Sequence, residues 1–228
     1  MSDKTDNVGE TLKGISPSQP YGEKKWEIVQ AAAKLFIKKG IFNTGVRDIS
    51  AASGITVGTL YHYFKSKDDI IAAFMDFSVY GTETFLKAAP EILNTMGPRE
   101  ALKQSIQRYI EYVDEAQNIV LFWHQETKSV QPELRKKLLD NELVLIGLLG
   151  DIIERGQKTG VFNSAVDPRL AAHNIIVMGD MWAFRRWDLG KRYTSDQFVK
   201  RQVEFILRSL CDGVVESENE SGEVKEKR

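Results

Sequence analysis

The stretch that most constrains this chain is residues 44–67, which predict two short helices joined by one tight turn. Gly54 supplies the positive φ that ends the first helix sharply, and either Thr44 or Gly45 can cap its start. Thr56 then caps the second helix. The inward face of the first helix is formed at helical spacing by Val46, Ile49 and Ala52 or Ser53. Two such helices around a tight turn are typical of a helix-turn-helix.

The second of these helices has an unusual outer surface. Leu60 and Phe64 lie four residues apart and can both face inward. The remaining positions are small or aromatic rather than charged: Val57, Gly58, Thr59, Tyr61, His62 and Tyr63. A helix that meets only solvent, the alternative here, normally carries Lys and Glu, whereas a helix in the DNA major groove places such groups against base edges and thymine methyls. We therefore expect DNA binding, with Lys65 and Lys67 near phosphates.

Residues 23–67 resemble the TetR family of one-component transcriptional repressors. The residues that carry the resemblance are Phe36, Gly40, Phe42, Thr44, Val46, Arg47, Asp48, Ile49, Gly54, Gly58, Thr59, Leu60, Tyr61, Tyr63, Phe64, Ser66 and Lys67. The resemblance implies a three-helix DNA-binding head followed by a long fourth helix.

The resemblance also implies which side chains meet DNA. Thr44 and Arg47 would act at the start of the second head helix, and Lys67 at the start of the fourth. On the third helix the family would use Thr56, Val57, Thr59, Tyr61, His62 and Tyr63. One position departs from the family, because Gly45 stands where Ser or Thr is common. A hydroxyl that could bind a phosphate is therefore missing, and we expect the cap role to fall to Thr44.

Charge is divided unevenly along the chain. The 228 residues have a formal net charge of −1, but residues 23–65 alone carry +4, so the remainder carries −5. A basic head on an acidic body favours DNA binding through the head, because phosphates attract the one and repel the other. Such binding is expected to weaken as salt is added.

The composition, 42% hydrophobic and 28% charged, is that of a globular protein with a core of ordinary size. The single cysteine, Cys211, allows neither an internal disulfide nor a cysteine-based zinc site. The longest apolar run, residues 143–149, is far shorter than the roughly 20 residues of a membrane helix, and the first residues have no signal-peptide pattern. We expect a cytoplasmic protein without a membrane partner.

The periodicity along the chain predicts helices and no strands, so the expected fold is all-α. The expected domains are a flexible arm at 1–22, the DNA-binding head at 23–67, a ligand-binding and dimerisation body at 68–215, and a disordered charged tail at 216–228. The expected helices are 23–39 in the head, one from Ser66 toward Pro90, and then 98–115, 117–129, 132–157, 167–189 and 194–215.

The most unusual stretch of the body is residues 178–189, which combine aromatic, thioether and guanidinium side chains. In one interpretation its aromatic residues pack against the last helix and against a second copy of the chain. In the other, Arg185 or Arg186 holds a phosphate or carboxylate of an amphipathic ligand at the mouth of an apolar tunnel, since guanidinium groups bind such anions in a bidentate way.

Residues 120–128, 156–162 and 181–187 resemble the branch of the family that responds to fatty acyl-CoA or related CoA thioesters. This implies an acyl group in the apolar interior, an arginine at the CoA phosphates, and a shift of the fourth helix that separates two heads. The candidate ligand-binding residues are Phe122, Trp123, Glu126, Met178, Trp182, Arg185, Arg186 and Trp187. No cofactor is expected beside this effector. A hydrophobic drug-like effector controlling efflux or detoxification genes is the alternative.

Dimerisation is expected because a single short recognition helix specifies little sequence, whereas two heads about 34 Å apart can bind a palindromic operator. The helices near 167–189 and 194–213 are long and apolar enough to form a four-helix interface between two copies. The candidate contacts are Ile175, Ile176, Phe198, Val203, Phe205, Ile206 and Leu210.

The spacing of reactive residues supports neither an enzyme nor a metal site. The three histidines form no catalytic or metal-binding motif, and His124 and Glu126, two apart on a helix, do not face each other. Two minor alternatives stay open. One is an enzyme that turns over a bound thioester, and the other is a protein-interaction adaptor that shows no salt-sensitive DNA binding.

Overall fold

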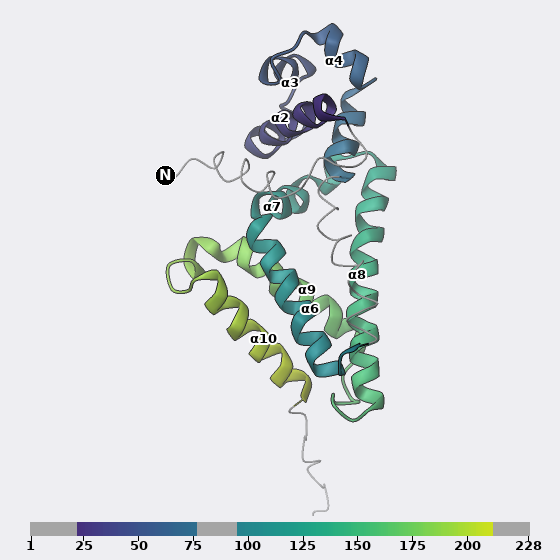
Figure 1. Ribbon diagram of the computed structural model, residues 1–228, viewed down its shortest axis with the longest axis vertical. Helices are drawn as coiled ribbons and strands as arrows, with labels where there is room; N and C mark the ends of the chain where they lie inside the picture. Colours follow the sequence, from purple (N-terminus) through teal and green to yellow (C-terminus); the bar gives the residue numbers. More distant parts are fainter. Residues whose placement is uncertain (1–21, 77–94, 212–228) are drawn as a thin grey trace, which may run out of the picture.

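The computed structural model describes residues 22–76 and 95–211, and within these ranges it contains helices and loops but no strand. The all-α prediction is therefore confirmed. Figure 1 shows a small head at one end of an elongated body. The head contains α2 (Glu23–Lys39), α3 (Val46–Ala52) and α4 (Val57–Tyr63). The body contains α6 (Pro98–Glu115), α7 (Gln117–Glu126), the 3-10 turn η1 (Thr127–Ser129), α8 (Pro132–Lys158), α9 (Pro168–Leu189) and α10 (Ser195–Cys211).

Proline and glycine predicted most helix boundaries correctly. Pro98, Pro132 and Pro168 each begin a helix, where a missing N–H costs nothing. The helix predicted at 117–129 ends earlier, at Glu126, and continues as a 3-10 turn. Pro132 holds Gln131, the residue before it, in an extended conformation and so separates this turn from α8.

Some predictions fall outside the described residues. A helical segment at 67–76 follows the head and matches the start of the predicted fourth helix. The continuation of that helix toward Pro90 lies outside the described residues, as do residues 1–21 of the predicted arm, the end of the last helix after Cys211, and the predicted tail.

The head core forms where α2 packs against α3, α4 and the segment 67–76. Apolar residues of α2 spaced three and four apart point inward: Ile28, Val29, Ala32, Ala33 and Phe36. Trp26, predicted to lie in this stripe, is half-buried at its edge. Leu60 and Phe64 close the core from α4, and both are buried as predicted.

The helix α7 joins head and body. Its residues Ile119 and Phe122 are buried in the same apolar cluster as the head helices, and α7 also packs against α6 and α9 of the body. In Figure 1 it lies directly between the head and the long body helices. A ligand in the body that moves α7 would therefore also move the side chains of the head that pack against α7.

Candidate functional site

Two local features set the turn of the predicted helix-turn-helix. Gly54 lies between α3 and α4 with a φ of +65°, a left-handed conformation that glycine adopts without strain. Thr56 caps α4, and its hydroxyl accepts a hydrogen bond of 3.1 Å from the Thr59 N–H. Because Leu60 is buried, the opposite face of α4 is held toward solvent.

Most side chains predicted to meet DNA lie on the surface of the head. The exposed ones are Arg47, Thr56, Thr59, Tyr61, His62 and Lys65. Val57 and Tyr63 are half-buried. The ring of His62 lies edge-on to that of Tyr63, with 5.4 Å between centroids. The structure thus presents hydroxyl, aromatic and cationic groups together at the outer surface of α3 and α4, the groups that a major groove and its phosphates accommodate.

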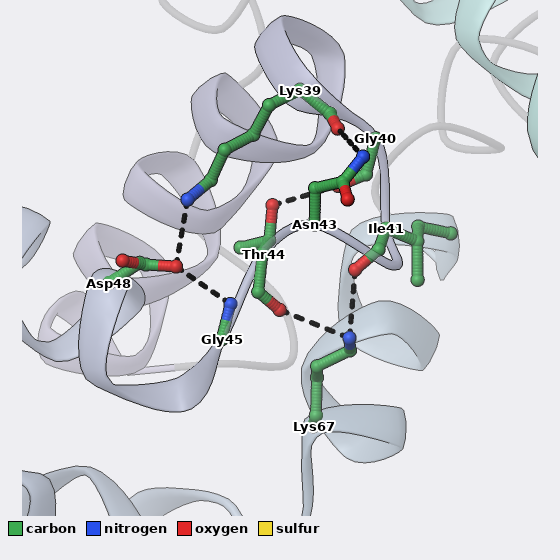
Figure 2. A network of polar contacts seen from close by, with 8 residues as sticks. All are labelled: Lys39, Gly40, Ile41, Asn43, Thr44, Gly45, Asp48 and Lys67. Carbon is green, nitrogen blue, oxygen red and sulfur yellow. Dashed lines mark hydrogen bonds and ion pairs between the residues drawn. The ribbon is translucent and has the colours of Figure 1, made fainter.

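Lys67 fixes the loop between α2 and α3 from inside the head (Figure 2). Its ammonium group donates to the carbonyl oxygens of Ile41 and Thr44, at 2.8 and 3.0 Å. Thr44 is fully buried, and its hydroxyl donates to the Gly40 carbonyl at 2.8 Å. The prediction for Thr44 is corrected, because its buried side chain does not reach the surface of the head. Lys67 uses two of its three N–H groups within the head, and a contact with DNA stays a prediction for it.

Gly45 holds the N-cap position of α3, so of the two residues predicted for it Gly45 is confirmed and Thr44 is not. The Asp48 carboxylate accepts a hydrogen bond of 2.8 Å from the Gly45 N–H and pairs with Lys39 Nζ at 2.7 Å (Figure 2). The hydrogen bond from Lys39, and next the one from Gly45, lower the pKa of Asp48. Gly45 has no side chain to accept from the helix, and Asp48 supplies the reciprocal half of a capping box by binding the Gly45 N–H.

Four aromatic rings, here called the ring cluster, connect the head to α7: Phe36, Phe74, Phe122 and Trp123. Phe122 stacks on Phe36 of α2 with 6.4 Å between centroids. Trp123 stacks on Phe74 of the segment 67–76 with 5.4 Å between centroids. Consecutive residues of α7 therefore contact α2 of the head and the segment that follows the head.

Glu126, at the end of α7, lies against the head at Gly40. A Cβ atom at Gly40 would stand 3.0 Å from the Glu126 Oε1, so this close approach suits a residue without a side chain. The other carboxylate oxygen of Glu126 is buried and has no hydrogen-bond partner among the described residues. Glu126 therefore faces the turn that follows α2 and not an effector.

A cavity of about 180 Å³ lies between α6, α7, α8 and α9. Among the described residues it is lined by Tyr109, Tyr112, Ile119, Val120, Trp123, His124, Thr127, Leu138, Leu139, Asn141, Glu142, Leu145, Ile176 and Asp180. The wall is mainly apolar with a few polar groups, as in small-molecule sites generally. Trp123 belongs both to this wall and to the ring cluster, so the cavity adjoins the contact that reaches the head.

The polar part of the cavity wall is centred on Asp180, which is only 4% exposed. The Tyr109 hydroxyl donates to Asp180 Oδ1 at 2.6 Å, and His124 Nε2 lies 3.1 Å from Asp180 Oδ2. Hydrogen bonding to Asp180 is the main cause that raises the pKa of His124, whereas burial is the main cause that raises the pKa of Tyr109 well above its usual value. Because these residues come from α6, α7 and α9, their hydrogen bonds link three helices at one side of the cavity.

Of the residues predicted to bind an effector, only Trp123 lines this cavity, and the register of α9 explains why. Ile176 and Asp180, four residues apart, face the cavity. Trp182 points instead into the body core, where it is 1% exposed and stacks on Phe198 with 4.7 Å between centroids. Met178 lines a separate groove between α9 and α10.

The remaining predicted ligand residues lie elsewhere. Phe122 and Glu126 face the head, as described above. Arg186 Nη1 donates to Asp114 Oδ1 at 2.5 Å and to Gln117 at 3.1 Å, so this arginine braces α9 against α6 and α7. Arg185 and Trp187 are exposed and do not line the cavity, and a contact with the outer part of a ligand stays a prediction for them.

The residues predicted to join two copies are, apart from Phe205, buried within the body of one chain. These residues were predicted from their apolar character. In the structure that character places them in the core of a single chain. The large apolar residues that α9 and α10 expose are Leu170, Val177, Phe184, Trp187 and Phe205. Leu170, Val177 and Phe184 follow at intervals of seven, which places them along one face of α9.

Sequence reasoning missed Tyr109 and Asp180 and gave His124 no role. A signal for Asp180 was present, since it is an acid inside an otherwise apolar stretch of α9. As predicted, His124 and Glu126 do not face each other, because one points to Asp180 and the other to Gly40. In residues 22–76 and 95–211 no group of three or more His, Cys, Asp or Glu side chains is arranged to hold a metal ion, and no helix there could span a membrane.

Comparison with known proteins agrees with this geometry. A sequence model of bacterial regulatory proteins of the tetR family matches residues 28–74, and one of a tetracyclin repressor-like C-terminal domain matches residues 95–210. The chain is 28% identical over 194 residues to the HTH-type transcriptional repressor KstR2 of Rhodococcus jostii (strain RHA1), covering 82% of this chain and 91% of that repressor.

Two solved structures share the fold. The TetR family transcriptional regulator PfmR from Thermus thermophilus superposes with a TM-score of 0.67 at 29% identity, covering 79% of this chain and 97% of PfmR. AibR in complex with isovaleryl coenzyme A and operator DNA superposes with a TM-score of 0.67 at 22% identity, covering 80% of this chain and 97% of AibR. The two family matches span the head and most of the body, and the chain belongs to the TetR family of bacterial regulatory proteins.

Proposed function

We propose that this regulator is a homodimeric repressor whose heads bind a palindromic DNA operator in the cytoplasm, and that a CoA thioester bound in the body releases it. The observation that carries the proposal is the double position of Trp123, which lines the cavity and stacks on Phe74 behind the helix-turn-helix. A ligand that displaces Trp123 acts on the segment 67–76, which carries the head. The head at 23–67 then serves as the DNA-binding domain and residues 68–215 as the effector and dimerisation domain.

The DNA-binding half of the proposal is supported by the surface of the head. Tyr61 and His62 of α4 are exposed beside Thr59, and such groups suit base edges in a major groove. Arg47 and Lys65 are exposed cations at the ends of this surface. They supply phosphate contacts, which dominate the affinity and its dependence on salt.

The effector half is supported by the cavity and by the fold. The cavity lies within the body and is lined mainly by apolar side chains, which suit an acyl group. AibR shows that this fold can hold a coenzyme A thioester and operator DNA. The exposed guanidinium of Arg185 on α9 is our candidate for the CoA phosphates. A coupling free energy of about 1–3 kcal/mol between ligand and DNA would change the affinity 5- to 150-fold.

The dimer is supported by the apolar surface of α9 and α10. Leu170 and Val177 of α9 and Phe205 of α10 are each more than half exposed in a single copy, and exposed apolar residues of this size are typical of interaction surfaces. A second copy packed on this surface through a two-fold axis covers all three. Sedimentation tests this: Val177→Glu is expected to yield monomers, whereas Leu143→Glu, an equally polar change at an exposed leucine of α8, is expected to leave the dimer intact.

The deciding experiment is fluorescence anisotropy of the full chain on DNA from immediately upstream of its own gene, with non-specific competitor present. Isovaleryl-CoA, stearoyl-CoA and free CoA are titrated into the complex. We expect specific binding that at least one thioester abolishes and free CoA does not. Tight binding indifferent to every thioester retains the repressor and favours a drug-like effector, while a failure to bind this DNA or selected palindromes refutes the regulator proposal. Recovery of the intact thioester afterwards argues against turnover.

A matched pair of substitutions tests the DNA contact itself. Arg47→Ala is expected to weaken operator binding and to lower the slope of log affinity against log salt by about one, because one phosphate contact is lost. Lys158→Ala removes the same charge from the exposed far end of α8 and is expected to change neither quantity. Equal effects from both would mean that binding follows net charge alone.

A further inference from the structure

The cavity has two features that together restrict what it can hold: it is small, and one side of it is strongly polar. A dry cavity of about 150 Å³ accommodates a benzene molecule. The present cavity, about 180 Å³, is therefore matched to an acyl group about as large as one ring or a short branched chain. A long saturated fatty chain has about three times as many carbon atoms as one ring and does not fit within this volume alone.

The polar side consists of a carboxylate with unused hydrogen-bonding capacity. An ionised carboxylate can accept about four hydrogen bonds, and Asp180 accepts one from Tyr109 and one from His124. Because Asp180 is almost fully buried, its remaining lone pairs are of little use to bulk water. A ligand group that fits them has to be a hydrogen-bond donor.

The donor that suits Asp180 is a neutral one. His124 Nε2 lies 3.1 Å from the carboxylate, and this hydrogen bond raises the pKa of His124, so Asp180 already has a basic partner. Glu142 of α8 faces the same histidine, and Tyr109 of α6 faces the same carboxylate. An additional cation is therefore not called for, whereas a hydroxyl group satisfies the carboxylate without adding charge.

Two other residues of the cavity wall have N–H groups that lack a hydrogen-bond acceptor. Trp123 and Asn141 line the cavity, and each carries a buried N–H group that has no acceptor among the described residues. A buried donor without an acceptor is unfavourable by about 1–3 kcal/mol. A hydroxyl or carbonyl oxygen on the ligand is the kind of acceptor these groups lack once the side chains adjust to a bound molecule.

We propose that the effector is a CoA thioester whose acyl group is short or monocyclic and carries a hydroxyl group that donates to Asp180. This inference rests on the proposed function, and it specifies the chemical class of the effector. Asp180 then acts as a specificity-determining residue, which distinguishes a hydroxylated acyl group from its unsubstituted counterpart. A site that hydrogen-bonds a ligand hydroxyl rejects the analogue that lacks it, because its own polar group is then left unsatisfied.

The test uses pairs of thioesters matched in size. Butyryl-CoA is compared with 3-hydroxybutyryl-CoA, and benzoyl-CoA with 4-hydroxybenzoyl-CoA, with stearoyl-CoA as the large probe. Affinities for the full chain are measured by calorimetry, and release from DNA by anisotropy. In at least one pair we expect the hydroxylated member to bind about tenfold more tightly, the size of one hydrogen bond to a charged group. Stearoyl-CoA is expected to bind more weakly than that member.

Variants assign the preference to its residue. Asp180→Asn is expected to reduce the tenfold ratio within the pair to near one. If this variant does not fold, as judged by circular dichroism, Tyr109→Phe provides the second measurement, because it changes the hydrogen bonding of the same carboxylate and is expected to shift the ratio. Leu138→Ala, on the apolar side of the cavity, is the control: it weakens both members of a pair equally and leaves their ratio unchanged.

The outcomes separate this inference from the proposed function. Equal affinities within both pairs, tightest binding of stearoyl-CoA, or a preference that survives Asp180→Asn overturns the hydroxyl inference while an acyl-CoA effector stands. No binding of any thioester overturns the inference and the effector half of the proposed function together. Specific operator DNA binding remains a separate result in either case.

Discussion

The indole ring of Trp123 stacks on the phenyl ring of Phe74, with their centroids 5.4 Å apart and their planes inclined by 25°. One ring lines the cavity of the body and the other belongs to the helical segment 67–76 that follows the recognition helix. Two sites are coupled when both bias the same packed element. This ring pair connects the cavity to the segment that follows the head.

Removing the indole should separate effector binding from its consequence. Trp123→Leu is expected to retain DNA binding without effector, because the head core is otherwise intact, but to reduce release by a saturating acyl-CoA at least tenfold. Leu138→Ala should weaken binding of the same acyl-CoA and still show full release once the cavity is saturated. Anisotropy titrations at several ligand concentrations measure both. Full release of Trp123→Leu at saturation would show that the coupling follows another route.

Lys67 is expected to contribute both to the stability of the head and to its affinity for DNA. Lys67→Met keeps most of the apolar stem but leaves the carbonyls of Ile41 and Thr44 without their donor. Each lost hydrogen bond to a charged group costs about 1.5–3 kcal/mol, reduced where water can replace the donor. We expect a lower free energy of unfolding, by about 1–2 kcal/mol, together with weaker operator binding at every salt concentration.

The control for this prediction is Lys65→Met, at an exposed lysine two residues earlier. It is expected to lower the salt slope of DNA binding by about one and to leave stability unchanged. Chemical unfolding and salt-dependent anisotropy distinguish the two lysines. If Lys67→Met behaved like Lys65→Met, with no loss of stability, the ammonium of Lys67 would be a phosphate ligand first and a loop contact second.

Asp114 is predicted to be important for the stability of the body. Its carboxylate accepts hydrogen bonds from Trp182 Nε1 at 2.6 Å and from Arg186 Nη1 at 2.5 Å. Asp114→Ala leaves a buried indole N–H without a partner and is expected to lower the free energy of unfolding by about 2–3 kcal/mol. Asp188→Ala breaks an exposed pair with Arg192 and should cost at most about 0.5 kcal/mol. Equal losses in urea titrations would contradict this assignment.

The helices and the helix-turn-helix could be predicted because their signals are local. Gly54 and Thr56 act on backbone groups within a few residues, and Pro98, Pro132 and Pro168 each set the first turn of their own helix. Local signals failed where a partner from another element intervened. Thr44 looked like a cap, but Gly45 holds the cap position with its N–H bound by Asp48, and the Thr44 hydroxyl donates to the loop before it.

The effector site could not be predicted in the same way, because it depends on which face of α9 turns toward which neighbour. Trp182 and Arg186 carry the chemistry expected of a ligand site, yet both serve packing within the body. Asp180 faces the cavity, and its partners Tyr109 and His124 lie 71 and 56 residues away in the sequence. Nothing in a single sequence states such a pairing, although an acid inside an apolar helix indicates that a partner exists.

Tyr109 owes its position to Gly179, the neighbour of Asp180 in α9. A Cβ atom at residue 179 would lie 2.7 Å from two ring carbons of Tyr109, closer than real contacts allow. Gly179→Ala is therefore expected to displace the ring, to lower the free energy of unfolding by about 1–3 kcal/mol, and to weaken the Tyr109 hydrogen bond to Asp180.

Gly147→Ala provides the matched control in α8. Among the described residues, no atom outside the nearby backbone of α8 lies within 4 Å of a Cβ built there, and alanine is the better helix former, so stability should rise by as much as about 1 kcal/mol. If close packing decides the outcome, urea unfolding should show a lower free energy of unfolding for Gly179→Ala and a higher one for Gly147→Ala. A stabilised Gly179→Ala would mean that Tyr109 has room to move and does not fix the polar wall.

The pair of His124 and Asp180 predicts a pH dependence of stability whose sign follows from the raised pKa of His124. A group with a higher pKa in the folded state stabilises the fold fully below its unfolded pKa, about 6.5 for histidine, and loses this contribution as the pH rises through the folded value. The free energy of unfolding should therefore fall as the pH increases from about 6.5. Because half of the His124 side chain is exposed, the change should be only about 0.5 kcal/mol.

Substitution isolates this contribution. His124→Gln removes the titrating group and should flatten the decline in stability above about pH 6.5, whereas His173→Gln, at an exposed histidine of the same protein, should follow the wild type. Urea titrations at closely spaced pH values measure the difference. A parallel course of the wild type and His124→Gln would show that the 3.1 Å contact does not persist in solution. Asp180 would then stand in the cavity with Tyr109 as its sole partner among the described residues, and would have still more capacity for a ligand donor.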